Sequence, residues 1–255
     1  MTATVSIVMN TYNRIEHLEA AVRSVLQQTY RDFELVLRDD GSTDATRTLV
    51  QELAQRDARI RVELGEHLGY AGGLRAALDI AAGEYVACVN SDDLLEETAL
   101  AKTVPLLEAG AEVGMVYTDY VSINAQGQLL GYGDRCRIPY SPERLLTDFM
   151  TFHFRLFRRS VVDAVGGIDT SIAGAVDYDL CLRLSEVTEI VHLAEPLYFH
   201  RVNPRSVSDG ARLAQIMSSK DAIQRALERR GLSENHALEL EILGKFTLRA
   251  RDGAP

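Results

Sequence analysis

Two adjacent carboxylates, Asp92 and Asp93, end the polar cluster Asn90-Ser91-Asp92-Asp93, which directly follows the apolar run 85–89. Adjacent carboxylates repel each other unless a cation or hydrogen bonds offset their charge. A divalent ion with oxygen ligands is the simplest such cation, and a diphosphate would supply further oxygens. The cluster is therefore a candidate site for a metal and a diphosphate. The alternative is that Asp92 or Asp93 caps a helix that begins at the next residues.

Two further polar clusters follow apolar runs earlier in the chain. Thr11-Tyr12-Asn13-Arg14 comes after the run 5–9, and Asp39-Asp40-Gly41-Ser42-Thr43-Asp44 comes after the run 33–37. Repeated strand–helix–strand units with short connections predict a parallel sheet that is covered by helices on both faces. Ligands of such sheets bind beyond the carboxyl ends of the strands. The three clusters together therefore predict one site, whereas each alone would indicate a solvated turn.

The periodicity of apolar residues predicts the other elements. Up to about residue 112 we expect strands over 5–9, 33–37, 59–64 and 85–89. Between them we expect a helix over 14–28, a second helix capped by Ser42 or Thr43, and a third over 72–82. Beyond it we expect strands over 113–123, 128–132 and 151–157, a loop over 133–150, a helix over 176–186, a strand over 190–199 interrupted by Pro196, and two helical patterns between 210 and 249. The last two would form a packed hairpin or a docking element.

The composition limits the partners and the compartment. The formal net charge of −10 argues against a nucleic-acid backbone or an anionic membrane surface as the main partner. The cysteines Cys88, Cys136 and Cys181 are far apart and odd in number, which fits a reducing cytoplasm rather than a disulfide framework. With no long apolar run and no basic leader, we expect a cytoplasmic protein, and peripheral contact with the inner face of a membrane stays open.

Five motifs in this order resemble the signatures of family 2 glycosyltransferases with the GT-A fold, over roughly residues 4–208. They are the two earlier clusters, Gly83-Glu84-Tyr85 leading to Asn90-Ser91-Asp92-Asp93, Gly166-Gly167-Ile168-Asp169, and Val176-Asp177-Tyr178-Asp179-Leu180-Cys181-Leu182-Arg183. The resemblance implies an α/β fold with a Rossmann-like, mostly parallel central sheet flanked by helices. It implies a GT-A domain over 1–208, with a nucleotide-binding half (1–120) and an acceptor half (121–208), and a C-terminal helical extension over 209–255.

The resemblance also implies an inverting transfer of a sugar from a nucleoside-diphosphate sugar, expected to be UDP-linked, to the hydroxyl of a glycan, lipid-linked or small-molecule acceptor. Mn²⁺ or Mg²⁺ is the implied cofactor, nucleic acid is not an expected partner, and a homodimer through the C-terminal helices stays open. One alternative is a catalytically silent homologue that binds a nucleotide or glycan. The other is a sugar nucleotidyltransferase, although the glycine-rich, basic N-terminal loop of that class is missing from Asn10-Thr11-Tyr12-Asn13.

Carried over by position, the expected nucleotide-binding residues are Thr11, Tyr12, Arg14, Asp39, Asp40, Arg75, Asn90 and Ser91. Asp40 would hydrogen-bond the base, with Asp39 beside it. Tyr12 would stack on the base or else form an aromatic lid on the sheet edge. Arg75 would reach the diphosphate or else be an exposed helix arginine. Asn90 stands where the family has an aspartate that contacts the ribose, so metal dependence is expected to be weaker than in the family.

Asp92 matches the last acid of the family's DxD motif and is the expected metal ligand. His200 is a weaker second candidate, because Asn203 stands where some relatives have a metal-binding histidine. Arg201 and Arg205 lie in a segment that resembles the loop over the diphosphate, where they would offset phosphate charge.

The acceptor side is expected to contain Asp93, Val176 and Asp177. An inverting transfer needs a carboxylate that takes the proton of the attacking hydroxyl. Asp177 matches the position of that base in the family, with helix capping as its alternative role. Val176 replaces the glutamate that usually precedes the base. Asp93 would support Asp92 or face the acceptor.

Overall fold

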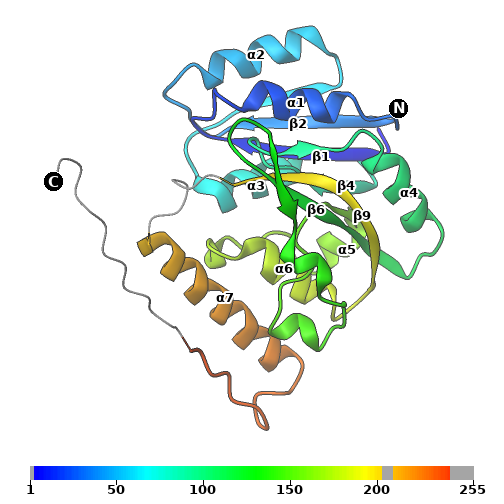
Figure 1. The fold of residues 1–255 in the computed structure, drawn as a ribbon, viewed down its shortest axis with the longest axis vertical. Helices are drawn as coiled ribbons and strands as arrows, with labels where there is room; N and C mark the ends of the chain where they lie inside the picture. Colours follow the sequence, from blue (N-terminus) through cyan, green and yellow to red (C-terminus); the bar gives the residue numbers. More distant parts are fainter. Residues whose placement is uncertain (1–2, 203–208, 242–255) are drawn as a thin grey trace, which may run out of the picture.

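A nine-stranded sheet forms the centre of the computed structural model, which describes residues 3–202 and 209–241 (Figure 1). Its strands are β1 (Val5–Thr11), β2 (Phe33–Asp39), β3 (Ile60–Leu64), β4 (Tyr85–Cys88), β5 (Leu94–Leu95), β6 (Val113–Ile123), β7 (Leu129–Tyr132), β8 (Arg155–Arg158) and β9 (Glu189–Arg201). The α-helices are α1 (Leu18–Leu26), α2 (Thr46–Arg56), α3 (Gly69–Ile80), α4 (Ala99–Glu108), α5 (Arg159–Ala164), α6 (Val176–Leu184) and α7 (Asp209–Arg229). Short 3₁₀ helices are η1 (Asp134–Arg137), η2 (Arg144–Leu146) and η3 (Thr170–Ile172).

The strands lie in the order β3-β2-β1-β4-β8-β6-β9-β5, and β7 pairs with β6. β1 runs parallel to β2 and β4, β2 runs parallel to β3, and β6 runs parallel to β9. β8 is antiparallel to both of its neighbours, β4 and β6. The apolar runs of β1 and β2 are buried on both faces, as expected of strands inside a parallel sheet. The mostly parallel α/β sheet predicted from the sequence is confirmed.

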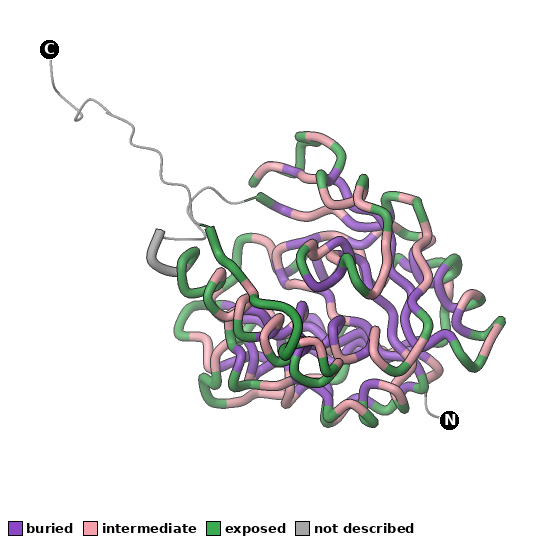
Figure 2. Tube along the Cα trace, turned by 90° about the horizontal axis from the view of Figure 1, so that it is seen from below, coloured by how far each residue is buried: buried purple, intermediate pink, exposed green. Residues whose placement is uncertain are grey.

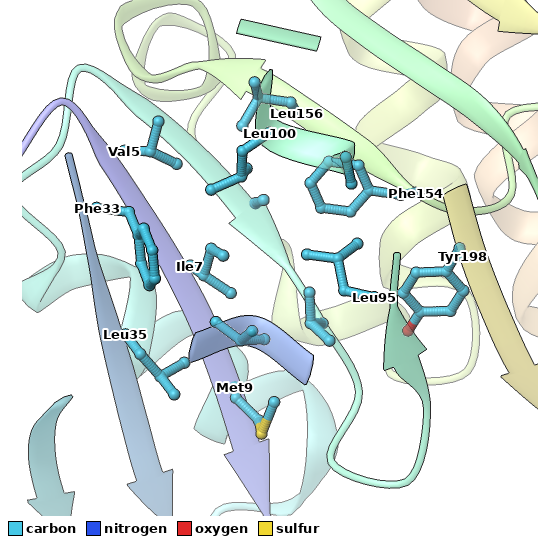
Figure 3. Packing of buried hydrophobic residues seen from close by; sticks show 14 of the residues in the cluster. Val5, Ile7, Met9, Phe33, Leu35, Leu95, Leu100, Phe154, Leu156 and Tyr198 are labelled. Carbon is cyan, nitrogen blue, oxygen red and sulfur yellow. The ribbon is translucent and has the colours of Figure 1, made fainter. Parts of the chain in front are cut away.

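Helices cover both faces of the sheet. α1, α2 and α4 contribute to one buried cluster, shown from close by in Figure 3, and α3, α5, α6 and α7 contribute to the other. Figure 2 shows the buried segments gathered in the middle of the trace, with exposed segments around them. Within the described ranges, no helix combines the length and the apolar character that crossing a membrane requires.

The chain that leaves the acidic cluster enters a strand. β5 pairs antiparallel with β9, and α4 begins only at Ala99. The alternative role of Asp92 or Asp93 as a helix cap is therefore wrong. The pairing with β9 instead holds this turn against the second half of the sheet.

Two details of the predicted elements also differ from the structure. The expected cap at Ser42 or Thr43 is wrong, since α2 begins at Thr46; the Ser42 hydroxyl instead accepts a hydrogen bond of 3.0 Å from the Asn13 backbone N–H. β9 continues through Pro196, and its pairing with β6 shifts register at this point. A proline lacks the backbone donor of a regular ladder, and the shift accommodates that loss.

The C-terminal part of the described chain is one helix packed against the sheet domain. α7 contacts α6, and Ala226 and Leu227 are buried in the same cluster as α6 (Figure 1). The Arg229 guanidinium also donates two hydrogen bonds of 2.8 Å to the Glu186 carboxylate. The second helical pattern forms no helix over 232–241, and its remainder lies outside the described residues. The division of the chain at residue 208 stays a prediction.

Truncating the buried side of α7 should destabilise the whole domain. Leu227 is 6% exposed, so Leu227→Ala should lower the free energy of unfolding by about 2–4 kcal/mol. Leu213→Ala, on the exposed side of the same helix, is the matched control and should change it by less than about 0.5 kcal/mol. Urea denaturation measures both values. Equal, small losses in the two variants would show that α7 does not pack on the domain in solution.

Candidate functional site

A cavity of about 770 Å³ brings the three polar clusters together. On one side it is lined by Asn10, Tyr12 and Arg14, by Asp40, and by Asn90, Ser91 and Asp92. These residues lie at or just beyond the carboxyl ends of β1, β2 and β4, which are parallel neighbours. The other side is lined by Phe152 and His153, by Val176 and Asp177 of α6, and by residues of α7.

The carboxylate of Asp40 is buried at one end of the cavity. Its Oδ1 accepts a 2.9 Å hydrogen bond from the Leu68 backbone N–H and pairs with the buried Arg38 guanidinium. Its Oδ2 lies 3.0 Å from Nδ1 of His67. The Tyr12 ring packs on the His67 ring, with 4.1 Å between the centroids. Two rings and one carboxylate thus form a pocket end that suits a planar base with an N–H donor.

Thr11 and Asp39 directly precede Tyr12 and Asp40 in the chain, but neither is among the described residues that line the cavity. Side chains alternate along a strand, so Asn10 and Tyr12 face the cavity and Thr11 points the other way. Asp39 is fully buried, and its carboxylate accepts a hydrogen bond of 3.3 Å from the Ser42 backbone N–H. These positions do not support the expected nucleotide contacts of Thr11 and Asp39, which instead shape the turn.

Asp93 is buried beneath the acidic turn. Its Oδ2 accepts hydrogen bonds from the Tyr198 hydroxyl at 2.8 Å and from the Asn90 amide at 2.9 Å. Its Oδ1 accepts a hydrogen bond from the Arg201 backbone N–H at 2.6 Å. Burial raises the pKa of the Asp93 carboxyl above its ordinary value, although the nearby His200 and these hydrogen bonds oppose the shift. Of its two expected roles, the structure favours support of the turn over contact with an acceptor.

Asp92 is the carboxylate of this turn that faces the cavity. Its side chain is 29% exposed, and its Oδ2 lies 3.6 Å from Nε of Arg14. No group of three His, Cys, Asp or Glu side chains in residues 3–202 and 209–241 could hold a metal by itself. Mg²⁺ and similar ions, however, commonly bind through one or two carboxylates together with substrate phosphates. The donor set at Asp92 therefore fits an ion that is shared with a diphosphate.

Three of the other predicted site residues lie elsewhere. The Arg201 guanidinium donates to the backbone carbonyls of Asp92, Asn124 and Ala125. The Arg75 guanidinium donates to the carbonyls of Gly166 and Ile168 and to the Asp79 carboxylate. His200 packs on the Phe152 ring at 5.2 Å and is not among the described residues that line the cavity.

These positions give no support to three predictions. The Arg201 and Arg75 guanidinium groups donate to backbone carbonyls, and neither residue is among the described residues that line the cavity. The position of His200 gives no support to its role as a metal ligand. Arg205, the second predicted arginine of the diphosphate loop, lies outside the described residues.

Asp177 lies in the first turn of α6, on the side of the cavity opposite the strand ends. Its Oδ2 is 3.3 Å from Nη2 of the buried Arg155, and its Oδ1 accepts a 2.9 Å hydrogen bond from the Tyr178 backbone N–H. The carboxylate is 29% exposed, so it is oriented yet reachable. Val176 contributes an apolar surface beside it.

His153 lies behind Asp177, where it stacks on the Tyr198 ring with 4.7 Å between the centroids. Burial, and then the nearby Arg155 guanidinium, lower the pKa of His153 well below its usual range. Its imidazole is therefore neutral. Among the α6-side residues of the cavity, Asp177 is thus the acidic side chain.

Several residues of the cavity were missed by the sequence analysis. They are Asn10, His67 as a partner of Asp40, Tyr70, Phe152, His153 and the α7 residues Ala214, Gln215 and Ser218. The sequence does contain a signal for Arg155, the partner of Asp177. A charged residue inside an apolar strand is rarely buried without a partner, so its presence there indicates a nearby acid. The α7 residues carry no comparable signal.

The structure explains why an amide at position 90 is favourable, and a substitution tests the explanation. Asn90→Asp would place a second carboxylate within hydrogen-bond distance of Asp93 and remove one of its donors. In EDTA we expect a loss of about 1–3 kcal/mol in the free energy of unfolding, measured with urea. Mn²⁺ should restore part of it. Asn90→Ala removes the donor without adding charge, so its free energy of unfolding should fall by less. If Asn90→Asp were as stable as the wild-type protein, the explanation would be contradicted.

Comparison with known proteins places the chain in a family. The sequence pattern of Glycosyl transferase family 2 matches residues 6–166. The chondroitin synthase of Escherichia coli is 33% identical over 194 residues, which are 76% of this chain and 28% of that protein. The hyaluronan synthase of Pasteurella multocida is 33% identical over 194 residues, which are 76% of this chain and 20% of that protein. The chain thus matches less than a third of the length of each relative.

Solved structures share the fold. S. aureus TarS 1–349 in complex with UDP has a TM-score of 0.66 at 19% identity, over 94% of this chain and 67% of that chain. The mannosyltransferase PcManGT from Pyrobaculum calidifontis, in complex with GDP-Man and Mn²⁺, has a TM-score of 0.62 at 18% identity, over 93% of this chain and 77% of that chain. Both likenesses agree with the predicted GT-A architecture. Since the family pattern covers more than half of its sequence, the chain belongs to glycosyl transferase family 2.

Proposed function

We propose that this chain is an inverting glycosyltransferase that uses a nucleoside-diphosphate sugar. The observation that carries the proposal is the single cavity in which the strand-end residues Asp40 and Asp92 face Asp177 of α6. Asp40 would bind the base, Asp92 would hold a metal and the diphosphate, and Asp177 would take the proton of the acceptor. One cavity thus offers a carboxylate for each group of a nucleotide sugar and its attacking hydroxyl.

The donor we favour is a UDP-sugar. Asp40 has a carboxylate oxygen beside the cavity that can accept an N–H from uracil, and Tyr12 offers an aromatic surface. The β-1,3-glucosyltransferase WfgD of Escherichia coli, named for its use of UDP-Glc, is 36% identical over 121 residues, which are 47% of each chain. The S. aureus TarS structures with UDP and UDP-GlcNAc support the same choice. PcManGT is bound to GDP-Man, so GDP must be compared with UDP in a binding experiment.

Asp92 would hold Mn²⁺ or Mg²⁺ jointly with the oxygens of the donor diphosphate. The ion would offset the charge that develops on the departing diphosphate. Arg14, which lies 3.6 Å from Asp92, would turn its guanidinium toward the same phosphates. Asn90 and Ser91, which line the cavity beside Asp92, would contact the ribose.

Asp177 would act as the general base. As the acceptor oxygen attacks the anomeric carbon, its proton moves to a carboxylate oxygen of Asp177, and the bond between that carbon and the diphosphate oxygen breaks. Attack on the face opposite the leaving group inverts the anomeric configuration. Arg155 holds one Asp177 oxygen at 3.3 Å and so limits the orientations of the carboxylate.

The acceptor we propose is a glycan, in line with the polysaccharide synthases among the relatives. A lipid-linked or small-molecule acceptor, a cytoplasmic location, contact with the inner face of a membrane and a homodimer through the C-terminal helices remain predictions from the sequence. A catalytically silent homologue is the second candidate, because Val176 and Asn90 replace two acids of the family pattern.

A thermal-shift series tests the donor and the metal site. UDP should raise the melting temperature of the wild-type protein, since a ligand at 100 times its Kd stabilises by about 2.7 kcal/mol, and added Mn²⁺ should raise it further. Asp92→Asn should lose the Mn²⁺ increment and keep the shift with UDP alone. Asp163→Asn, an exposed acid outside this cavity, is the control. A larger shift with GDP than with UDP would reassign the donor, and no shift with any nucleotide would refute the proposal.

Substitution of the proposed base separates catalysis from binding. Asp177→Asn keeps the shape of the side chain but removes its basicity, so sugar transfer should fall by about 10²–10⁴-fold. The shift with UDP and Mn²⁺ should not change. UDP release from UDP-sugars, with methyl glycosides as acceptors, measures the transfer. Retained transfer would contradict the assignment of Asp177, whereas UDP binding without turnover in the wild-type protein would favour the silent homologue.

A further inference from the structure

The cavity does not end at Asp177, because its wall continues onto the first half of α7. Gln215 and Ser218 line this part, together with Ala214. Opposite them runs the segment before α6. A Cβ on Gly174 would lie 2.7 Å from Oγ of Ser218 and 3.2 Å from Cα of Gln215. The two backbones therefore approach so closely that a residue with a side chain at position 174 would push α7 away.

The position of this wall is fixed by the second half of α7. Ala226 is fully buried, Arg225 donates a 2.9 Å hydrogen bond to Asp169, and Arg229 pairs with Glu186. Residues 212–217 of the helix are largely exposed, and Ala214, Gln215 and Ser218 line the cavity. A helix is stiff over this length, so anchoring one half holds the other half in place.

This wall comes from a part of the chain that the family pattern does not cover. The pattern ends at residue 166, whereas α7 begins at Asp209. The strand ends proposed to bind the donor all lie within the pattern. The wall lines the same cavity as the proposed base Asp177, which also lies outside the pattern, so it is placed to contact the acceptor rather than the nucleotide of the donor.

The side chains at this end suit a neutral sugar ring. Gln215 offers an amide donor and acceptor, and Ser218 offers a hydroxyl. Phe152 contributes an aromatic ring to the same cavity. Arg14 is the one Lys or Arg among the described residues that line the cavity, and it lies 3.6 Å from Asp92; Asp177 is already paired with Arg155. Arg135, whose guanidinium lies 4.7 Å from the centroid of the Phe152 ring, is outside the lining and donates to the Phe149 carbonyl. A carboxylate or phosphate beside Gln215 and Ser218 would therefore find no uncommitted cation among the described residues of the lining.

We infer that Gln215 and Ser218 of α7, with the ring of Phe152, form an acceptor subsite for a neutral terminal sugar of a glycan. The sugar ring packs on Phe152, its hydroxyls hydrogen-bond Gln215 and Ser218, and the attacking hydroxyl points to Asp177. The inference rests on the proposed glycosyltransferase function. Beyond that function, it specifies a neutral sugar as the acceptor group and names the residues that would select it.

Kinetics with two glutamine variants of the same helix test the subsite. The acceptors are methyl β-glycosides of glucose, galactose and N-acetylglucosamine, with methyl β-glucuronide as the anionic probe. Gln215→Ala should raise the KM for the neutral glycosides about threefold to tenfold, the equivalent of one lost hydrogen bond. Gln224→Ala, outside the cavity, should leave it unchanged. Both variants should keep the wild-type UDP shift, and Gln224→Ala should also keep the wild-type rate of UDP-sugar hydrolysis without acceptor.

An unchanged acceptor KM in Gln215→Ala, or a preference for the glucuronide over all neutral glycosides, would overturn the inference. Failure of the proposed function would look different, because the wild-type protein itself would then show no UDP shift or no UDP release.

A fluorescence measurement keeps the subsite testable even without turnover. The chain contains no tryptophan, so Phe152→Trp introduces one tryptophan, which can be excited selectively, into the proposed subsite and keeps an aromatic ring there. Neutral methyl glycosides should change its emission in the presence of UDP and Mn²⁺. Adding Gln215→Ala should weaken this binding about threefold to tenfold, and adding Gln224→Ala should not. No emission change with any neutral glycoside, at the highest soluble concentration, would also overturn the inference.

Discussion

In the turn after β4, the buried carboxylate of Asp93 accepts hydrogen bonds from the Asn90 amide, the Tyr198 hydroxyl and the Arg201 backbone N–H. The last two donors belong to β9, more than a hundred residues further along the chain. A buried carboxylate is strongly unfavourable unless donors surround it, so the turn and β9 hold each other in one arrangement. Asp92 is thereby directed into the cavity, and the turn after β4 is joined to the second half of the sheet.

Buried arginines support the other two acids of the site in the same way. Arg38 lies behind Asp40, and Arg155 lies behind Asp177. Removing Arg38 would leave the buried carboxylate of Asp40 without its cation, and the loss of one partner of a buried pair typically costs about 3–5 kcal/mol. Removing Arg155 should cost less, because the Asp177 carboxylate is 29% exposed. These cations are therefore committed to the protein's own carboxylates. In a chain with a net charge of −10, whose Arg75 and Arg201 guanidinium groups also donate to backbone carbonyls, the proposed metal ion at Asp92 would supply the counter-charge for the proposed diphosphate.

The main strands of the first half and the location of the cavity could be predicted because both follow from local patterns. Apolar runs predict buried strands, and the carboxyl ends of parallel neighbours must meet at one edge. What could not be predicted depends on distant contacts or on strand geometry. No local pattern pairs Asp177 with Arg155 or places His67 against Tyr12. The alternation of side chains at the end of β1 decides that Asn10 rather than Thr11 faces the cavity, and a shift of one residue reverses that outcome.

The two ends of the cavity therefore depend on different kinds of contact. The donor end is built from strand ends whose positions are fixed by the hydrogen-bond ladders of the sheet. The acceptor end is completed by a helix crossing at Gly174, which lies outside the matched family pattern. A substitution on the cavity-facing side of α7 can change the wall beside Asp177 without moving the strand ends. In this architecture the acceptor preference can thus diverge while the donor site and the proposed base stay in place.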